Sequence, residues 1–294
     1  MNPADDVPQP RSIEEVEATV ERNRARRESR ARVTAVLYPL ATAVGLIALW
    51  EAATRAFAIP VFLLPPPSAV VTAFSANAAL LLRAGWVTTV EIVLGYLLSV
   101  AVGVPLALAI FLWPPFARSI YPLLVSSQAM PKVAIAPLFI VWFGFGLLPK
   151  VLIAFLIAFF PIVINTAMGL AAIEPEKIHL ARSMGLGAGA TFLKIRVPDA
   201  LPTIFGGLKI SITLAVVGAV VGEFVGGDAG LGYQLMVANG SMDTALLFAG
   251  LIGLTILGVI LFALVELAER LAIPHARATT GGGGIEEPIV STER

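Results

Sequence analysis

The chain has 294 residues, of which 57% are hydrophobic and only 14% are charged, and its mean hydropathy is +0.88. Soluble domains contain about 25% charged residues, so this composition excludes an ordinary soluble globule and predicts an all-α polytopic membrane protein. Twenty basic residues balance twenty acidic ones, which gives no reason to expect a nucleic-acid partner. Because the chain has no cysteine and only two histidines, we expect no metal site and no cofactor on it.

The first polar segment, 1–32, is rich in helix-forming residues and in charges of both signs. This pattern predicts a cytoplasmic N-terminal helix or tail. The apolar run that follows could be a signal peptide cleaved after the small residues Ala56 and Ala58. The long tail with several glutamates before it favours a retained membrane helix instead.

Six apolar stretches have roughly the length of 20 residues that crosses a bilayer. Four carry no charge, one carries only Lys132 and one carries only Lys209. The stretch with Lys132 is too long for a straight span, so we interpret it as one helix bent near Pro131 and Pro137. In chain order the six stretches are 33–50, 92–117, 119–149, 151–173, 200–222 and 244–265.

A seventh uncharged stretch, 56–82, contains Pro60 and three consecutive prolines at 65–67. Proline removes backbone hydrogen bonds that lipid cannot replace, so we expect an external loop with a short interfacial helix here. The other end of the chain, 275–294, contains four consecutive glycines and is expected to be a flexible cytoplasmic tail. The membrane domain is therefore expected to span 33–274.

The basic residues are distributed unequally between the two sides of the membrane. If the N-terminus is cytoplasmic, that side receives fifteen of the twenty basic residues and the other side receives Arg55, Arg83 and Lys150. Cytoplasmic segments of membrane proteins are enriched in Lys and Arg. We therefore expect both termini to be cytoplasmic.

The segment 174–202 is too long for a simple connection between two spans. Its sequence predicts a short helix over 175–184, a stop in the left-handed conformation at Gly185, and a second short helix that ends at 197–198. Such a rigid helical pair is suited to insert into a groove on a soluble partner. The alternative is a solvated loop folded back on the helix ends.

This segment resembles the EAA signature of the permease subunits of ATP-binding cassette importers. In that signature, Glu-Ala-Ala is followed by three residues, a glycine, nine residues and then Ile-x-Leu-Pro. His179 and Leu180 depart from the signature, standing in place of the Glu and the first Ala. The matching positions are Ala181, Gly185, Ile195, Val197 and Pro198.

Four other motifs look like the nitrate, sulfonate and taurine branch of these permeases, which also includes carriers of thiamine and riboflavin precursors. They are Leu-Pro-Pro-Pro-Ser at 64–68, the prolines and Lys132 within 131–138, Trp-Phe-Gly-Phe-Gly at 142–146 and Gly-Leu-Gly-Tyr at 230–233. The resemblance covers roughly 33–274. It implies a fold of six transmembrane helices with a cytoplasmic coupling-helix loop.

The resemblance also implies the partners and the location of the protein. It implies a homodimer in the lipid of the bacterial inner membrane, two cytoplasmic ATPase subunits and an extracytoplasmic substrate-binding protein. ATP would be bound by the ATPase subunits, and the chain itself, which has no P-loop motif, would not be an enzyme. The residues expected to couple to the ATPase are Glu176, His179, Ala181, Arg182, Ser183, Gly185, Ile195 and Pro198.

Polar residues within the spans are candidates for the translocation path, because charges are costly in lipid and commonly functional. The candidates are Glu91, Gln128, Lys132, Asn165 and Glu223. The structural alternative is that they pair with one another or with backbone carbonyls. An acid at position 91 would repel anions, which favours a neutral or heterocyclic solute over nitrate or a sulfonate.

Two other classes of function remain open. An ion-coupled secondary transporter could use Glu91, Lys132 and Glu223, although only one proline-interrupted span is visible and a paired one would be expected. A membrane enzyme is disfavoured because no nucleophile, metal cluster or acid/base pair is visible in the sequence.

Overall fold

The computed structural model describes residues 37–273, and its contacts divide the chain into two units, 1–69 and 70–294. The described residues form helices joined by turns and short irregular segments and contain no strand, which confirms the all-α class. The expected N-terminal helix or tail, 1–32, and the expected flexible tail, 275–294, lie outside the described residues.

In the first unit, the helix Leu37–Ala56 is followed by proline-rich turns and by the start of α2 (Pro67–Ala76). The Glu51 carboxylate accepts hydrogen bonds from the Ser68 backbone N–H at 3.0 Å and from the Ser68 hydroxyl at 2.8 Å. Arg55 Nε donates to the same carboxylate at 2.6 Å. Glu51 therefore caps the first turn of α2, where a negative charge is favoured. The short helix expected within 56–82 is confirmed.

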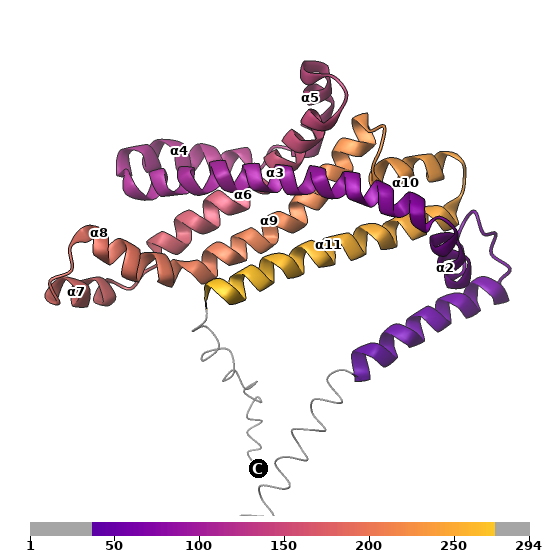
Figure 1. Cartoon of the computed structure of the whole chain (residues 1–294), viewed down its shortest axis with the longest axis horizontal. Helices are drawn as coiled ribbons and strands as arrows, with labels where there is room; N and C mark the ends of the chain where they lie inside the picture. Colours follow the sequence, from indigo (N-terminus) through magenta and orange to yellow (C-terminus); the bar gives the residue numbers. More distant parts are fainter. Residues whose placement is uncertain (1–36, 274–294) are drawn as a thin grey trace, which may run out of the picture. The chain divides into compact units, whose positions relative to one another are not determined.

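The second unit contains the remaining helices (Figure 1). Four of its helices are long and apolar enough to cross a membrane: α3 (Ala78–Leu112), α6 (Leu147–Ala171), the continuous helix Ala188–Gly226 and α11 (Thr244–Ala272). The main part of the continuous helix is α9 (Val197–Gly226). With Leu37–Ala56 they make five spans among the described residues. A sixth exists if the bent pair formed by α4 (Pro114–Ser127) with η1 (Lys132–Ile135) and α5 (Ala136–Phe143) counts as one span.

The second span differs from its predicted bounds of 92–117. It begins at Ala78 because Arg83 is exposed near its start and Glu91 is buried beside a lysine, so neither charge interrupts the helix. It ends at Leu112, and two consecutive prolines then begin α4. The expected external loop therefore ends before residue 78 rather than at 82.

The third span bends where the sequence predicts. The axes of α4 and of the η1–α5 segment differ by 87°, and the break contains Pro131. Pro137 causes no bend, because it lies in the first turn of α5, where a helix needs no backbone N–H donor. The span is thus broken at Pro131 alone and more sharply than a simple kink.

The most buried span is α6, which packs against both α3 and α9. Small residues allow these close contacts, as is usual between membrane helices. A Cβ atom added at Gly95 of α3 would lie 2.6 Å from Ala154 Cβ, and one added at Gly218 of α9 would lie 2.6 Å from Ala154 Cα. Ala154 of α6 therefore touches the backbone of a helix on each side.

We expect Gly218→Ala to destabilise the protein by about 1–3 kcal/mol, because the new methyl group would clash with the backbone of α6. The matched control is Gly258→Ala in α11, where a Cβ meets no atom within 4 Å. The measurement is thermal unfolding of the detergent-purified chain. Equal melting temperatures for the two variants would show that the close contact at Gly218 does not contribute to the stability of the protein.

Candidate functional site

The helix α7 (Pro175–Ser183) forms the first half of the candidate coupling loop, in agreement with the predicted 175–184. Pro175 occupies its first turn, where proline is well accommodated. Glu176 lies in the first turn and Arg182 in the last turn, so each charge interacts favourably with the opposite partial charge at its end of the helix. The local sequence therefore accounts for both ends of this helix.

Gly185 ends α7 in the left-handed conformation, with φ of +79°, as predicted. The Leu186 N–H donates to the Ala181 carbonyl at 3.0 Å, and the Gly185 N–H donates to the Arg182 carbonyl at 2.9 Å. These two bonds form a Schellman motif, which fixes the direction of the chain after the helix. Ala181 is buried beneath this turn, with 1% of its surface exposed.

The prediction for the second half of the loop is wrong. Instead of a short helix ending at 197–198, α8 (Ala188–Thr191), the π-helical turn η2 (Phe192–Arg196) and α9 form one continuous helix. The backbone of η2 has π-helical i→i+5 hydrogen bonds instead of the i→i+4 bonds of an α-helix. This turn comes just before Pro198, which has no backbone N–H to donate. The fifth span therefore extends directly into the loop, with Ile195 half-buried and Pro198 exposed on it.

Polar contacts hold α7 against the rest of the loop. The Asp199 carboxylate accepts hydrogen bonds from the Lys177 ammonium at 3.1 and 3.3 Å and raises the pKa of Lys177 above its usual value, with a smaller contribution from Glu174. Arg196 donates to the Leu170 carbonyl at 2.9 Å and so ties η2 to the end of α6. No sequence motif marks the pair formed by Lys177 and Asp199, because its members are 22 residues apart.

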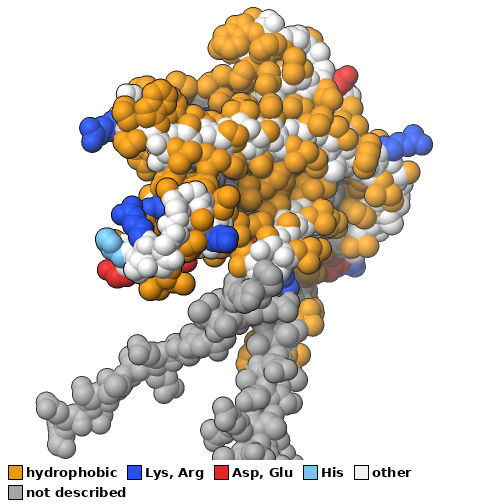
Figure 2. Space-filling view, turned by 60° about the vertical axis from the view of Figure 1, so that its left-hand side comes forward, with side chains coloured by type: hydrophobic (Ala, Val, Ile, Leu, Met, Phe, Trp, Pro, Cys, Tyr) orange, Lys and Arg blue, Asp and Glu red, His pale blue; other side chains and the backbone are white. Residues whose placement is uncertain are grey.

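The outer surface of this loop carries both polar and apolar exposed side chains (Figure 2). Among the predicted coupling residues, those exposed are Glu176, His179, Arg182, Ser183, Gly185 and Pro198. Three large apolar side chains are also exposed and were not predicted as coupling residues: Leu180, Met184 and Leu193. The spacing of Leu180 and Met184, one helical turn apart in a polar segment, was the signal that could have identified them.

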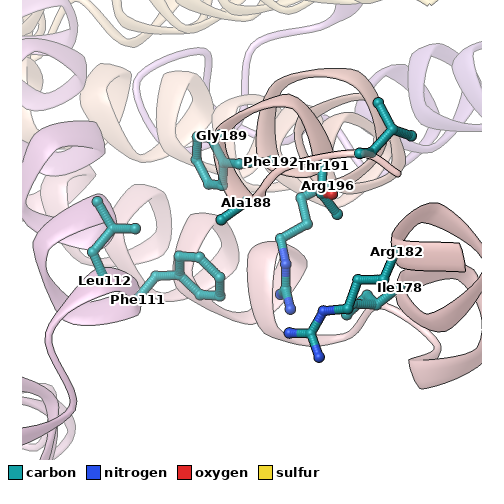
Figure 3. Close-up of a pocket in the computed structure, with 10 residues that line it drawn as sticks. Phe111, Leu112, Ile178, Arg182, Ala188, Gly189, Thr191, Phe192 and Arg196 are labelled. Atoms are coloured by element: carbon teal, nitrogen blue, oxygen red, sulfur yellow. The ribbon is translucent and has the colours of Figure 1, made fainter. Parts of the chain in front are cut away.

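A pocket of about 470 Å³ lies between the loop and the end of α3 (Figure 3). Phe111 and Leu112 of α3 form one wall, and α7, α8 and η2 form the others. The guanidinium groups of Arg182 and Arg196 reach into this pocket.

A second site lies at the other end of the long helices and is built around a buried ion pair. Lys150 Nζ of α6 lies 2.9 Å from Glu91 Oε1 of α3, with both side chains almost wholly buried. The Glu223 carboxyl group of α9 lies close enough to Glu91 to interact with it electrostatically. Lys150 also lies 3.5 Å from Asp228 Oδ1 and donates to the Ala229 carbonyl at 3.4 Å.

Glu223 also holds the start of α10 (Leu231–Gly240). Its carboxylate accepts a hydrogen bond from the Thr88 hydroxyl at 2.6 Å and one from the Gly232 backbone N–H. The Leu231 N–H donates to the Thr88 hydroxyl oxygen at 2.8 Å. A Cβ at Gly232 would lie 2.6 Å from Glu223 Oε2, so the glycines of the 230–233 motif leave room for this carboxylate. Sequence reasoning missed Thr88 and Lys150 as members of this cluster.

The structure brings together only two of the five predicted path residues, Glu91 and Glu223. Lys132 lies over the Phe160 ring at 4.4 Å, and Phe160 is ten residues, or about 15 Å, further along α6 than Lys150. Gln128 is exposed at the break after α4. Asn165 is half-buried and donates to the Pro161 carbonyl at 2.8 Å.

We expect Lys150→Met to destabilise the protein by about 3–5 kcal/mol, because it leaves two buried carboxyl groups without their counter-charge. The double variant Glu91→Gln with Lys150→Met should recover part of this loss. Lys209→Met, which removes the partly exposed partner of Glu269, is the matched control with a smaller effect. Denaturant or thermal unfolding in detergent measures all three, and purely additive effects would contradict the coupling.

The family comparison supports the resemblance seen in the sequence. Residues 99–274 match the family described as "Binding-protein-dependent transport system inner membrane component". The formylaminopyrimidine transport permease protein ThiX of Halalkalibacterium halodurans is 34% identical over 78% of this chain and 92% of its own length. The riboflavin transport system permease protein RibX of Chloroflexus aurantiacus is 38% identical over 78% of this chain and 86% of its own. The taurine transport system permease protein TauC of Escherichia coli is 28% identical over 79% and 87%.

A solved structure shows the same fold. A chain of the MetNI methionine ABC transporter, in an inward-facing conformation, superposes with a TM-score of 0.59 at 19% identity. The match covers 67% of this chain and 98% of that one. The chain therefore belongs to the family of binding-protein-dependent transport system inner membrane components, and it is a membrane-spanning permease subunit of the ABC importer class.

Proposed function

We propose that the loop 174–202 docks a separate ATPase subunit and transmits its movement to the membrane helices. The observation that carries this proposal is a rigid, protruding element with exposed Leu180, Met184 and Leu193. Large apolar side chains exposed on a protruding polar loop are typical of a protein interface. The loop also continues without interruption into α9, so a displacement of the loop acts directly on a membrane span.

The wider assembly we propose is a homodimer of this chain with two ATPase subunits and an extracytoplasmic substrate-binding protein. ATP is then bound by the partner, and no cofactor is needed on this chain. The membrane face that carries α7 holds Lys177, Arg182, Lys194 and Arg196, whereas the opposite ends of α3 and α6 hold Arg83 and Lys150. This difference supports a cytoplasmic location for the loop and for both termini in the bacterial inner membrane.

The translocation path we propose runs along the break in the third span, past Gln128, Lys132 and Asn165. Glu91 and Glu223 flank this path by fixing α3, α9 and α10 rather than by facing solute, since both are almost fully buried. The family membership favours this ATP-driven path over the alternative of an ion-coupled carrier.

For the solute we propose a neutral or heterocyclic compound. Its support is that the permeases named for formylaminopyrimidine and riboflavin are 34% and 38% identical to this chain, against 28% for the taurine permease. The charge of Glu91 no longer argues for this choice, because Lys150 neutralises it.

We expect Gly185→Val to reduce ATPase recruitment strongly while leaving membrane insertion intact. A branched side chain is strained at a φ of +79°, so the turn that orients α7 would be lost. Gly187→Ala is the matched control, because its φ is −69° and a Cβ there meets no atom within 4 Å. The measurement is the ratio of ATPase to permease after purification from native membranes in mild detergent. Full recruitment by Gly185→Val would refute the docking assignment.

We expect Lys132→Met to lower binding-protein-stimulated ATP hydrolysis by about tenfold. This is the effect of losing one contact between the lysine and the solute, worth about 1–2 kcal/mol. The measurement is the rate of ATP hydrolysis by the native complex, reconstituted in liposomes with its binding protein. Arg270→Met, on the surface of α11, is the control. If Lys132→Met assembles and hydrolyses ATP like the wild type, Lys132 does not line the path.

A further inference from the structure

The pocket between α3 and the loop combines an apolar wall with two basic groups. The rings of Phe111 and Phe192 are stacked at 6.0 Å between centroids on its apolar side, and Ile178 adds to the same lining. The guanidinium groups of Arg182 and Arg196 also line the pocket, and that of Arg196 lies over the Phe111 ring (Figure 3). This combination suits a ligand that has both an anionic group and an apolar body.

The two arginines are held differently. Arg196 is fixed, because it donates to the Leu170 carbonyl and lies 4.9 Å from the centre of the Phe111 ring. Arg182 is exposed at the end of α7. Within residues 37–273, neither arginine forms a salt bridge with an acidic side chain. Two neighbouring guanidinium groups without a counter-charge attract an anion, and the fork of donors on each suits phosphate.

The end of α3 that lines the pocket carries side chains typical of the membrane interface. Leu112, which lines it, is the last residue of α3 and is 64% exposed, and Trp113 follows with 63% of its surface exposed. Exposed tryptophan at the end of a membrane helix is typical of the interface between lipid and water. The pocket thus places two arginines beside apolar side chains at the end of a membrane helix.

From this geometry we propose that the pocket binds an anionic phospholipid, with its phosphate between Arg182 and Arg196 and an acyl chain along Phe111 and Leu112. Basic pockets between membrane helices on the positively charged face are suited to anionic headgroups. A free phosphate ion would use the two arginines but not the apolar wall. The bound lipid would connect the end of α3 to α7, so lipid composition would affect the position of the loop.

The first experiment is native mass spectrometry of the full-length chain, purified in mild detergent and supplied with phosphatidylglycerol or phosphatidylcholine. We expect the wild type to retain phosphatidylglycerol preferentially and Arg182→Gln to retain it about fivefold less. Gly189→Leu should also lose it, because the leucine would fill the pocket while both arginines remain, and a Cβ at this glycine meets no atom within 4 Å. Arg118→Gln, an exposed arginine outside the pocket, should retain the lipid like the wild type.

Three results would overturn the proposal. Equal retention of phosphatidylglycerol by the wild type, Arg182→Gln and Gly189→Leu would show that the pocket holds no lipid. Displacement of the lipid by millimolar inorganic phosphate would assign the pocket to a free anion. Absence of lipid in the wild type, with loss of the ATPase subunit in Arg182→Gln, would assign the arginines to the protein interface. Lipid retention is measured on the chain without its ATPase, and ATPase binding is measured separately on the complex from native membranes, so the lipid result is independent of the docking proposal.

Discussion

The buried ion pair between Lys150 and Glu91 joins the start of α6 to the interior of α3, in a place where neither charge is stable alone. Removing either charge from water is costly, and the cost is offset only when the partner is held at close range. Here the partner is held because α6 packs against α3 through small residues such as Gly95 and Ala154. The ion pair and the close helix packing therefore depend on each other.

Glu223 extends this arrangement to α9 and α10. Its carboxylate accepts hydrogen bonds from the Thr88 hydroxyl and from the backbone N–H of Gly232 in the first turn of α10, a group that lipid could not satisfy. Two glycines leave the space for it. One end of the bundle is thus fixed by buried polar contacts, whereas the opposite end carries an exposed loop held by the partly exposed pair of Lys177 and Asp199. The two ends of the bundle therefore differ in the kind of contact that holds them.

The continuous helix from Ala188 to Gly226 connects the loop directly to a membrane span. The turn at Gly185 and the π-helical turn η2 lie on the two sides of α8 in this connection. The hydrogen bond between Lys177 and Asp199 also joins α7 directly to α9. The arginine pocket lies beside this connection and shares Arg182 and Arg196 with it.

The sequence by itself determined the features that depend on local chemistry. The apolar stretches located the spans, Pro131 located the break in the third, Pro175 and Gly185 set the two ends of α7, and the prolines after Ala56 excluded a further span. Each of these signals acts within a few residues, through a missing N–H or a permitted backbone angle. Tertiary structure alone decided the bounds of the second span and the surroundings of Glu91. A charged residue within an apolar stretch predicts the end of a membrane span unless its ion-pair partner is known. The partner of Glu91 is Lys150, which lies 59 residues away in the chain. The pocket and the pair of Lys177 and Asp199 likewise exist only because distant segments pack together, which no local pattern records.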